Sequence, residues 1–155
     1  NRRIDNGFFR SFGEPECKLM GVEHGWAAQR RLTAPATSYT VVGPAGDPWL
    51  SAGGLAPGDV IPGVVGYEWD SRVPGCFAGH VVPLMTARIR GWDGVTRSAD
   101  MVRATAPSGG RVFAMGTMEL GWALDGLDGH SPNQHVVKFV DAALRDLTRP
   151  LHRPR

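Results

Sequence analysis

The stretch MVRATAPSGGRVFAMGTM, residues 101–118, says more about the fold than any other part of the sequence. Residues 101–106 alternate apolar and polar side chains, which is typical of a half-buried β-strand. Pro107, Ser108, Gly109 and Gly110 predict a turn, and residues 111–118 read as a second strand. The stretch therefore predicts a β-hairpin.

Further strands are expected on the N-terminal side of this hairpin. Residues 81–89 form the clearest strand by composition, and residues 38–42 and 60–65 are also rich in β-branched side chains. Pro62 has no backbone N–H to donate, so it places the 60–65 strand at the edge or entry of a sheet.

A helix is expected on the C-terminal side. Ser131 suits the N-cap, Pro132 the first helical position and Gln134 the third, which together form a capping-box pattern. Apolar residues then recur at helical spacing as far as Leu147, and Pro150 ends the helix. With about six short strands and one good helix, the residues alone indicate a mixed α/β or α+β fold.

Composition and charge exclude several classes of protein. Hydrophobic residues make up 42% of the chain and the mean hydropathy is −0.19, which excludes a wholly disordered chain. No apolar run approaches the roughly 20 residues that span a bilayer, so no membrane partner is expected. The net charge is +2, of which the last eleven residues carry +3, leaving a nearly neutral body. That distribution argues against a nucleic-acid partner.

The cysteines and the N-terminus bear on the cellular compartment and on the domain boundaries of the chain. Cys17 and Cys76 are too few for a disulfide framework and form no CxxC pair. We expect two reduced thiols in a cytoplasmic protein, with a single bridge as the alternative. Asn1 is not an initiator methionine and no signal peptide follows it. Residues 1–155 are expected to be a single domain or the C-terminal fragment of a larger one.

Familiar catalytic motifs are absent from the sequence. A nucleophile elbow around Cys76 would need glycine where Pro74 and Ala78 stand. His130 and His135 do not have the spacing of a helical zinc pair, and no closed metal site is assembled from sequence spacing. One ligand contributed to a site shared with another polypeptide remains open.

A pair of carboxylates is the best candidate for chemistry. Glu68 follows an apolar strand and lies between Tyr67 and Trp69, which could shield it and raise its pKa toward that of a general acid or base. Asp70 would point to the same side if the strand continues. The alternative is that Glu68 only caps a loop, and the residues alone do not separate the two interpretations.

Two motifs carry a family resemblance. The stretches VGYEWD, residues 65–70, and GRVFAMGTMELGWALD, residues 110–125, resemble the C-terminal region of the N,N-dimethylformamidase large (beta) subunit family. Residues 9–13 and 19–22 resemble the family's entry into this region. The resemblance implies a degenerate glutamine-amidotransferase-like α/β domain, a flavodoxin-like three-layer fold that ends in the C-terminal helix.

The resemblance also implies an activity. Enzymes of this family hydrolyse small N-substituted formamides with iron, whose tyrosine and glutamate ligands are expected upstream of this chain. No metal ligand is therefore assigned here, and iron is expected only in the full assembly. Glu68 is the expected catalytic residue, taking a proton from the attacking water and returning it. Tyr67, Trp69, Asp70 and His24 are the expected pocket residues.

Two functions follow from these observations. The chain is expected to be part of an oligomeric amidohydrolase, completed by a preceding or second polypeptide and acting on a small amide. The alternative is a non-catalytic interaction or scaffolding module that keeps a degenerate fold. A doubly wound sheet needs crossover helices, and only one strong helix is visible. This shortage predicts docking on further polypeptide through Phe8, Phe9, Trp49 or Trp92.

Overall fold

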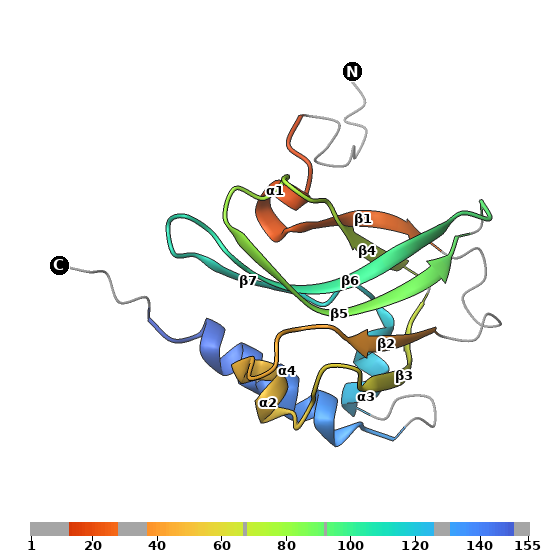
Figure 1. Ribbon diagram of the computed structural model, residues 1–155, viewed down its shortest axis with the longest axis vertical. Coiled ribbons are helices and arrows are strands. Elements are labelled where there is room, and N and C mark those ends of the chain that lie inside the picture. The colour runs from red at the N-terminus through yellow and green to blue at the C-terminus, as the bar shows by residue number, and fades with distance from the viewer. Residues whose placement is uncertain (1–12, 28–36, 67, 92, 126–130, 151–155) are drawn as a thin grey trace, which may run out of the picture.

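A computed structural model describes residues 13–27, 37–66, 68–91, 93–125 and 131–150 (Figure 1). The strands are β1 (Val22–Ala27), β2 (Thr37–Val41), β3 (Val60–Val65), β4 (Glu68–Arg72), β5 (His80–Arg90), β6 (Thr96–Thr105) and β7 (Arg111–Ala114). The helical segments are α1 (Cys17–Met20), α2 (Pro48–Ala52), η2 (Glu119–Gly121), α3 (Trp122–Asp125) and α4 (Gln134–Leu147).

The described strands form two antiparallel sheets. One is two-stranded, β1–β4, and the other is five-stranded with the order β3-β2-β5-β6-β7. Figure 1 shows the β1–β4 pair above the long strands β5 and β6, and α2 and α4 below them. The result is a mostly β architecture.

The expected flavodoxin-like, amidotransferase-like α/β fold is therefore wrong. A parallel sheet needs crossover connections of a dozen or more residues, usually helices. Here β5, β6 and β7 follow one another through tight connections and pair antiparallel. Among the described helices only α4, with 14 residues, exceeds five residues.

The hairpin expected at residues 101–118 is confirmed as β6 and β7. The backbone N–H of Ala106 donates to the carbonyl of Gly110 and closes the turn. β7 ends at Ala114 instead of continuing to residue 118. The chain turns at Gly116, whose φ is +71° and where a Cβ would lie 2.7 Å from the carbonyl carbon of Asp100. Close backbone packing thus ends the strand.

The other three expected strands are confirmed as β2, β3 and β5. Pro62 is exposed, and β3 lies at the edge of its sheet, as the missing N–H of proline requires.

The expected helix is confirmed as α4, but its N-cap is Asn133 and not Ser131. The Asn133 side chain accepts hydrogen bonds from the backbone N–H groups of His135, at 3.0 Å, and Val136, at 3.3 Å. Ser131 and Pro132 precede the helix. The helix therefore begins two residues later than the capping pattern predicts.

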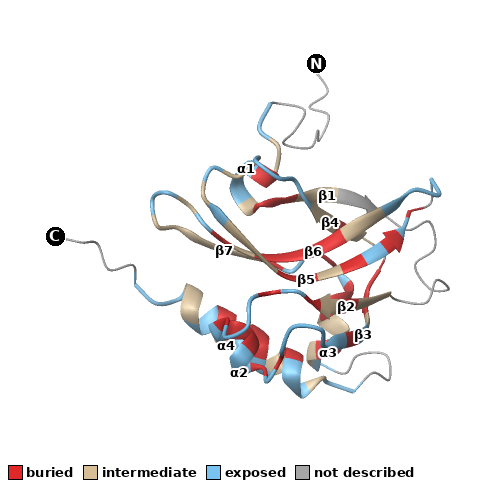
Figure 2. Cartoon of the chain, viewed as in Figure 1, coloured by how far each residue is buried: buried red, intermediate tan, exposed pale blue. Residues whose placement is uncertain are grey.

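The main core lies between the five-stranded sheet and the helices (Figure 2). Trp49 of α2 is only 2% exposed, and its ring meets that of Phe113 edge to face at 5.5 Å. Phe113 in turn meets Phe139 of α4 at 5.6 Å. Trp49 is thus part of the chain's own core, which corrects its expected place in a joint with other polypeptide. Phe8, Phe9 and Trp92 lie outside the described residues.

A smaller core attaches the β1–β4 pair to the other face of the large sheet. Its buried members are Val22, Val102 and Ala114, with Met20 and Val81 packed against them. Neighbouring residues of β6 point to opposite faces, so Met101 belongs to the main core and Val102 to the smaller one.

Candidate acid–base site

The β1–β4 ladder brings His24 and Asp70 together. They are direct cross-strand partners, and the Nδ1 atom of His24 lies 3.9 Å from Oδ1 of Asp70. Each side chain is 30% exposed, so both can be reached from solvent. Both residues belong to the expected pocket set, and the register of the ladder makes them neighbours.

Glu68 lies on the same side of β4 as Asp70, because side chains two residues apart on a strand share a face. Burial raises the pKa of Asp70, and the charges of Glu16 and Glu68 raise it further, whereas His24 opposes the shift. The surroundings of Asp70 thus favour the protonated form of its carboxyl group. We call His24, Asp70, Glu68 and Glu16 the acid–base cluster.

Trp69 points the other way. It is 1% exposed and belongs to the main core, so it anchors β4 and does not flank the Glu68 carboxylate. Tyr67 lies outside the described residues. Trp69 therefore does not shield the Glu68 carboxylate, contrary to the expectation from the sequence.

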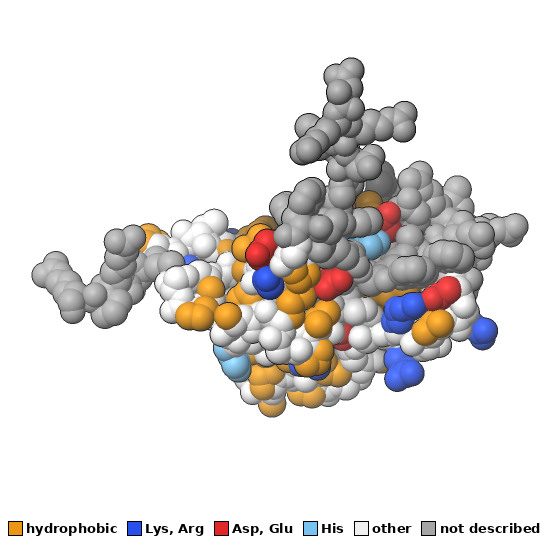
Figure 3. Space-filling view, turned by 90° about the horizontal axis from the view of Figure 1, so that it is seen from above, with side chains coloured by type: hydrophobic (Ala, Val, Ile, Leu, Met, Phe, Trp, Pro, Cys, Tyr) orange, Lys and Arg blue, Asp and Glu red, His pale blue; other side chains and the backbone are white. Residues whose placement is uncertain are grey.

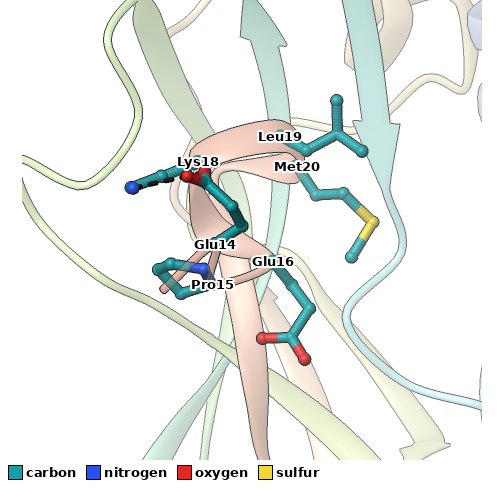
Figure 4. A pocket seen from close by; sticks show the side chains of 6 residues that line it. All are labelled: Glu14, Pro15, Glu16, Lys18, Leu19 and Met20. Carbon is teal, nitrogen blue, oxygen red and sulfur yellow. Dashed lines mark hydrogen bonds and ion pairs between the residues drawn. The ribbon is translucent and has the colours of Figure 1, made fainter. Parts of the chain in front are cut away.

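A cavity of about 340 Å³ lies beside α1 and adjoins the cluster through Glu16. Figure 4 shows six side chains that line it, with those of Leu19, Met20 and Glu16 toward the right of the view and those of Lys18 and Pro15 toward the left. The Lys18 ammonium donates to a Glu14 carboxylate oxygen at 3.3 Å. The described lining of the cavity thus combines apolar and charged side chains.

The two sequence motifs meet behind the cluster. Thr117 Oγ1 accepts from the Gly66 N–H and lies at the same distance, 3.3 Å, from the Gly66 carbonyl, to which it donates. The Glu119 carboxylate lies over Gly66, where a Cβ would come within 2.6 Å of its Cδ. Glu119, which belongs to the motif at residues 110–125, therefore requires glycine at residue 66 in the motif at residues 65–70.

Sequence analysis did not identify Asp100 and Glu119 as buried acidic residues that hold the structure together. Each is 7% exposed. Asp100 accepts from the Arg72 N–H at 2.9 Å and from the hydroxyls of Thr86 and Ser98, both at 2.7 Å. It thereby ties the end of β4 to β6. A lone acidic residue inside an otherwise apolar strand, as in ADMV at residues 99–102, is the signal that could have identified it.

Tyr39 lies close to this buried carboxylate. Its hydroxyl donates to the Met115 carbonyl at 3.1 Å. Burial, then the charges of Asp100 and Asp70, raise the pKa of Tyr39 well above its ordinary value. The phenol therefore stays protonated and acts as a hydrogen-bond donor.

Metal ligation finds no support in the described part of the chain. Among these residues no three His, Cys, Asp or Glu side chains are grouped so that they could hold a metal ion. His24 and Asp70 make only a pair, so the described residues do not fit an iron site.

The cysteines are joined. Cys17 and Cys76 form a disulfide with a Cα–Cα distance of 5.7 Å, so the expectation of two reduced thiols is wrong. The two cysteines are separated by 59 residues in the sequence, and the pairing of β1 with β4 brings them together. The sequence alone did not predict this contact.

Figure 3 views the molecule from the β1–β4 side. Acidic and basic side chains are interspersed with apolar ones on the described part of this face, and the basic ones form no continuous stripe. No helix in the described ranges is both long and apolar enough to cross a membrane.

The described chain is thus a mostly antiparallel β domain that carries an acid–base cluster on a two-stranded sheet. Residues 1–135 match the model of the family described as N,N-dimethylformamidase beta subunit-like, C-terminal. The chain belongs to this family, which confirms the resemblance seen in the two motifs. The family description places it in the C-terminal part of an enzyme subunit and implies that further polypeptide completes the enzyme. No curated protein matches the chain.

Proposed function

We propose that this chain is the C-terminal fragment of a subunit of an oligomeric amidohydrolase that acts on a small N-substituted amide, and that Glu68 is its acid–base residue. Membership of the dimethylformamidase beta subunit-like family supports the reaction class. The observation that carries the assignment is the position of Glu68 on the half-exposed face of β4, beside Asp70 and its partner His24.

The proposed role of Glu68 is a proton relay. Water attacks the amide carbonyl carbon, and the ionised Glu68 carboxylate takes the proton that the water loses. When the C–N bond breaks, Glu68 returns this proton to the departing amine, so that the carboxylate is ionised again, as it was at the start of the cycle. Asp70, whose pKa is raised mainly by burial, lies on the same face of β4 as Glu68.

The remaining parts of the active site are assigned to other polypeptide. Iron, if the complete enzyme contains it, would be held by residues outside the described ones, since these do not fit a metal site. Tyr67, Asp70 and His24 remain the proposed pocket residues, whereas Trp69, expected beside them, anchors β4 from the core side. A cytoplasmic location stays a prediction.

The test is Glu68→Gln in the complete enzyme, assayed on small formamides. We expect kcat to fall by about 10²- to 10⁴-fold, the loss typical of a missing acid–base group. Metal content and the unfolding curve should not change, because the side chain is half-buried and glutamine has almost the same shape.

Asp141→Asn is the matched control, because Asp141 is an exposed carboxylate on α4 that pairs with Arg145. It should leave kcat unaltered. Full activity in Glu68→Gln would remove the catalytic assignment and favour the interaction-module function instead.

A further inference from the structure

β4 has a main-chain partner on the edge that faces away from β1. Backbone N–H groups two residues apart on a strand point to the same side, so those of Asp70 and Arg72 leave β4 in one direction. The Asp70 N–H donates to the Gly116 carbonyl at 2.9 Å, as it would to a neighbouring strand. The pairing there is an isolated bridge between Trp69 and Thr117, and Arg72 lies beyond it.

A side chain continues the hydrogen bonding where this bridge ends. The Arg72 N–H donates to Oδ2 of Asp100, also at 2.9 Å. The Asp100 carboxylate of β6 therefore takes the place of the carbonyl that a longer strand would offer. The Ser71 hydroxyl donates to the Ser98 carbonyl of β6, which adds a second link between the same two strands.

The Asp100 carboxylate is itself held firmly. Oδ1 accepts from the Thr86 hydroxyl of β5, and Oδ2 accepts from the Ser98 hydroxyl of β6, both at 2.7 Å. Thr86 is the direct cross-strand partner of Asp100, and Ser98 lies two residues before it, so all three side chains share one face of the sheet. A carboxylate that is buried and fixed by two hydroxyls is a rigid acceptor for the main chain of β4.

Asp70 lies between these two anchors. Its own N–H is held by Gly116, and the N–H two residues later is held by Asp100. Burial is the largest cause of the raised pKa of Asp70, so the depth at which β4 lies on the large sheet decides how far water reaches this carboxyl group. The charged groups that act on it are those of His24, Glu16 and Glu68.

We propose that Asp100 is a positioning residue for the acid–base cluster: by accepting the Arg72 N–H, it holds β4 against the large sheet and keeps Asp70 at its partly buried depth. Asp100 acts through the backbone of β4 and is not a catalytic residue. The consequence for turnover rests on the function proposed above, whereas the positioning is a property of this chain and is measured on it.

Two substitutions of Asp100 separate its position from its charge. In Asp100→Asn the amide oxygen can still accept from Arg72 and Ser98, and the amide N–H can donate to the Thr86 hydroxyl, which is both donor and acceptor. Asp100→Ala removes the acceptor and leaves the Arg72 N–H without it. Both variants remove the negative charge, and only Asp100→Ala removes the hydrogen bond to β4.

The experiment is an NMR titration of the Asp70 carboxyl group on the full chain, combined with amide hydrogen exchange at Arg72. In Asp100→Ala we expect the pKa of Asp70 to fall toward 3.8 as β4 loosens and water gains access. The Arg72 amide should exchange at least about tenfold faster relative to the amides of β5, because it loses its acceptor. Asp100→Asn should keep both quantities close to those of the wild type.

Thr86→Val is a second, milder variant. It removes one of the two hydroxyls that fix the Asp100 carboxylate and keeps the side-chain shape nearly unchanged. We expect a smaller change in the same direction, so this variant tests the proposal if Asp100→Ala does not fold.

Asp47→Ala is the matched control for a loss of stability alone. Asp47 is also a buried carboxylate with three hydrogen bonds, from the backbone N–H groups of Trp49 and Leu50 and from the Arg103 guanidinium. It lies at the start of α2, and Figure 1 shows α2 and β4 on opposite sides of the long strands. Asp47→Ala should destabilise the protein without moving the pKa of Asp70 or the relative exchange of Arg72.

Three results would overturn the positioning role. An equal fall of the Asp70 pKa in Asp100→Asn and Asp100→Ala would show a direct effect of charge. A similar fall in Asp47→Ala would show a general effect of stability. An unchanged Asp70 pKa in folded Asp100→Ala, or in Thr86→Val where only that variant folds, would show that β4 does not depend on Asp100.

An assay of the complete enzyme keeps this proposal apart from the proposed function. Unaltered kcat in Asp100→Ala, in spite of a lowered Asp70 pKa, would count against a part for Asp70 in the proposed reaction. The positioning of β4 by Asp100 would be supported by the same pKa measurement.

Discussion

The Asp70 carboxylate lies in surroundings that oppose its negative charge. Burial is the largest cause, and Glu16 and Glu68 add repulsion, so the pKa of Asp70 is raised from 3.8 in spite of His24. The folded protein therefore binds a proton at Asp70 more tightly than the unfolded chain does. A tuned carboxylate of this kind is typical of functional sites.

Because Asp70 holds its proton more tightly when folded, its contribution to stability is favourable at low pH and is lost as the pH rises from 3.8 through the raised value. Asp70→Asn should abolish this part of the pH dependence of the free energy of unfolding. His24→Gln should steepen it, because the opposing charge is removed. Urea unfolding measured across that pH range tests both, and equal slopes in all three proteins would contradict the assignment.

At the scale of elements, Gly66, just before β4, allows close packing against the segment that follows β7. Gly66 leaves room for the Glu119 carboxylate, and a Cβ there would lie 2.8 Å from its Oε1. Thr117 pairs with Trp69 in an isolated bridge, which extends the ladder of β4 on its other side. The two motifs that carry the family resemblance are thus two sides of one contact.

Gly66→Ala should lower the free energy of unfolding by about 1–3 kcal/mol, the usual cost of overpacking a buried site. Part of this loss should disappear in a Glu119→Ala background, because the clashing carboxylate is gone, so a double-mutant cycle should give a coupling energy. Gly121→Ala is the control, since a Cβ there meets open space. Strictly additive effects would show that Gly66 and Glu119 do not constrain each other.

The start of α4 offers a second test at this scale. Asn133→Ala should cost about 1 kcal/mol of stability, since it removes the acceptor for two backbone N–H groups. Ser131→Ala, at an exposed residue outside the helix, should change stability by less than about 0.5 kcal/mol. Thermal unfolding of the two variants separates the observed cap from the one that the sequence pattern indicated.

For the whole molecule, the main consequence of the fold is a division into two cores on opposite faces of the large sheet. The five-stranded sheet, α2 and α4 share the main core, whereas Val22 of β1 lies in a smaller core and Cys17 of α1 forms the disulfide. The acid–base cluster draws on both cores, because Asp70 follows Trp69 of the main core and His24 lies on the same strand as Val22. The geometry of the cluster therefore depends on the packing of both cores.

Cys17→Ala/Cys76→Ala should lower the free energy of unfolding by roughly 4 kcal/mol, because the disulfide closes a loop with a separation of 59 residues and restricts the unfolded chain. Chemical denaturation of oxidised wild type and the variant measures this difference. Single substitutions, Cys17→Ala and Cys76→Ala, should each lose as much as the pair. A double variant as stable as the oxidised protein would mean that the bond does not restrict the unfolded state.

The sequence by itself determined the local elements of this protein. Alternation and turn residues specified the hairpin of β6 and β7, Pro62 specified an edge strand, and helical spacing specified α4. These predictions succeeded because strand period, proline geometry and helix amphipathicity act within one or two turns of chain. Glu68 and Asp70 on one face of a strand followed from the same period.

The tertiary structure alone decided how the elements combine. The resemblance predicted a parallel three-layer fold, and the strands instead pair antiparallel, because pairing depends on which distant edges meet. The disulfide, the His24–Asp70 pair and the contact of Glu119 with Gly66 each join residues more than forty positions apart. No local pattern records such contacts, since their free energy is gained only when the whole chain is folded.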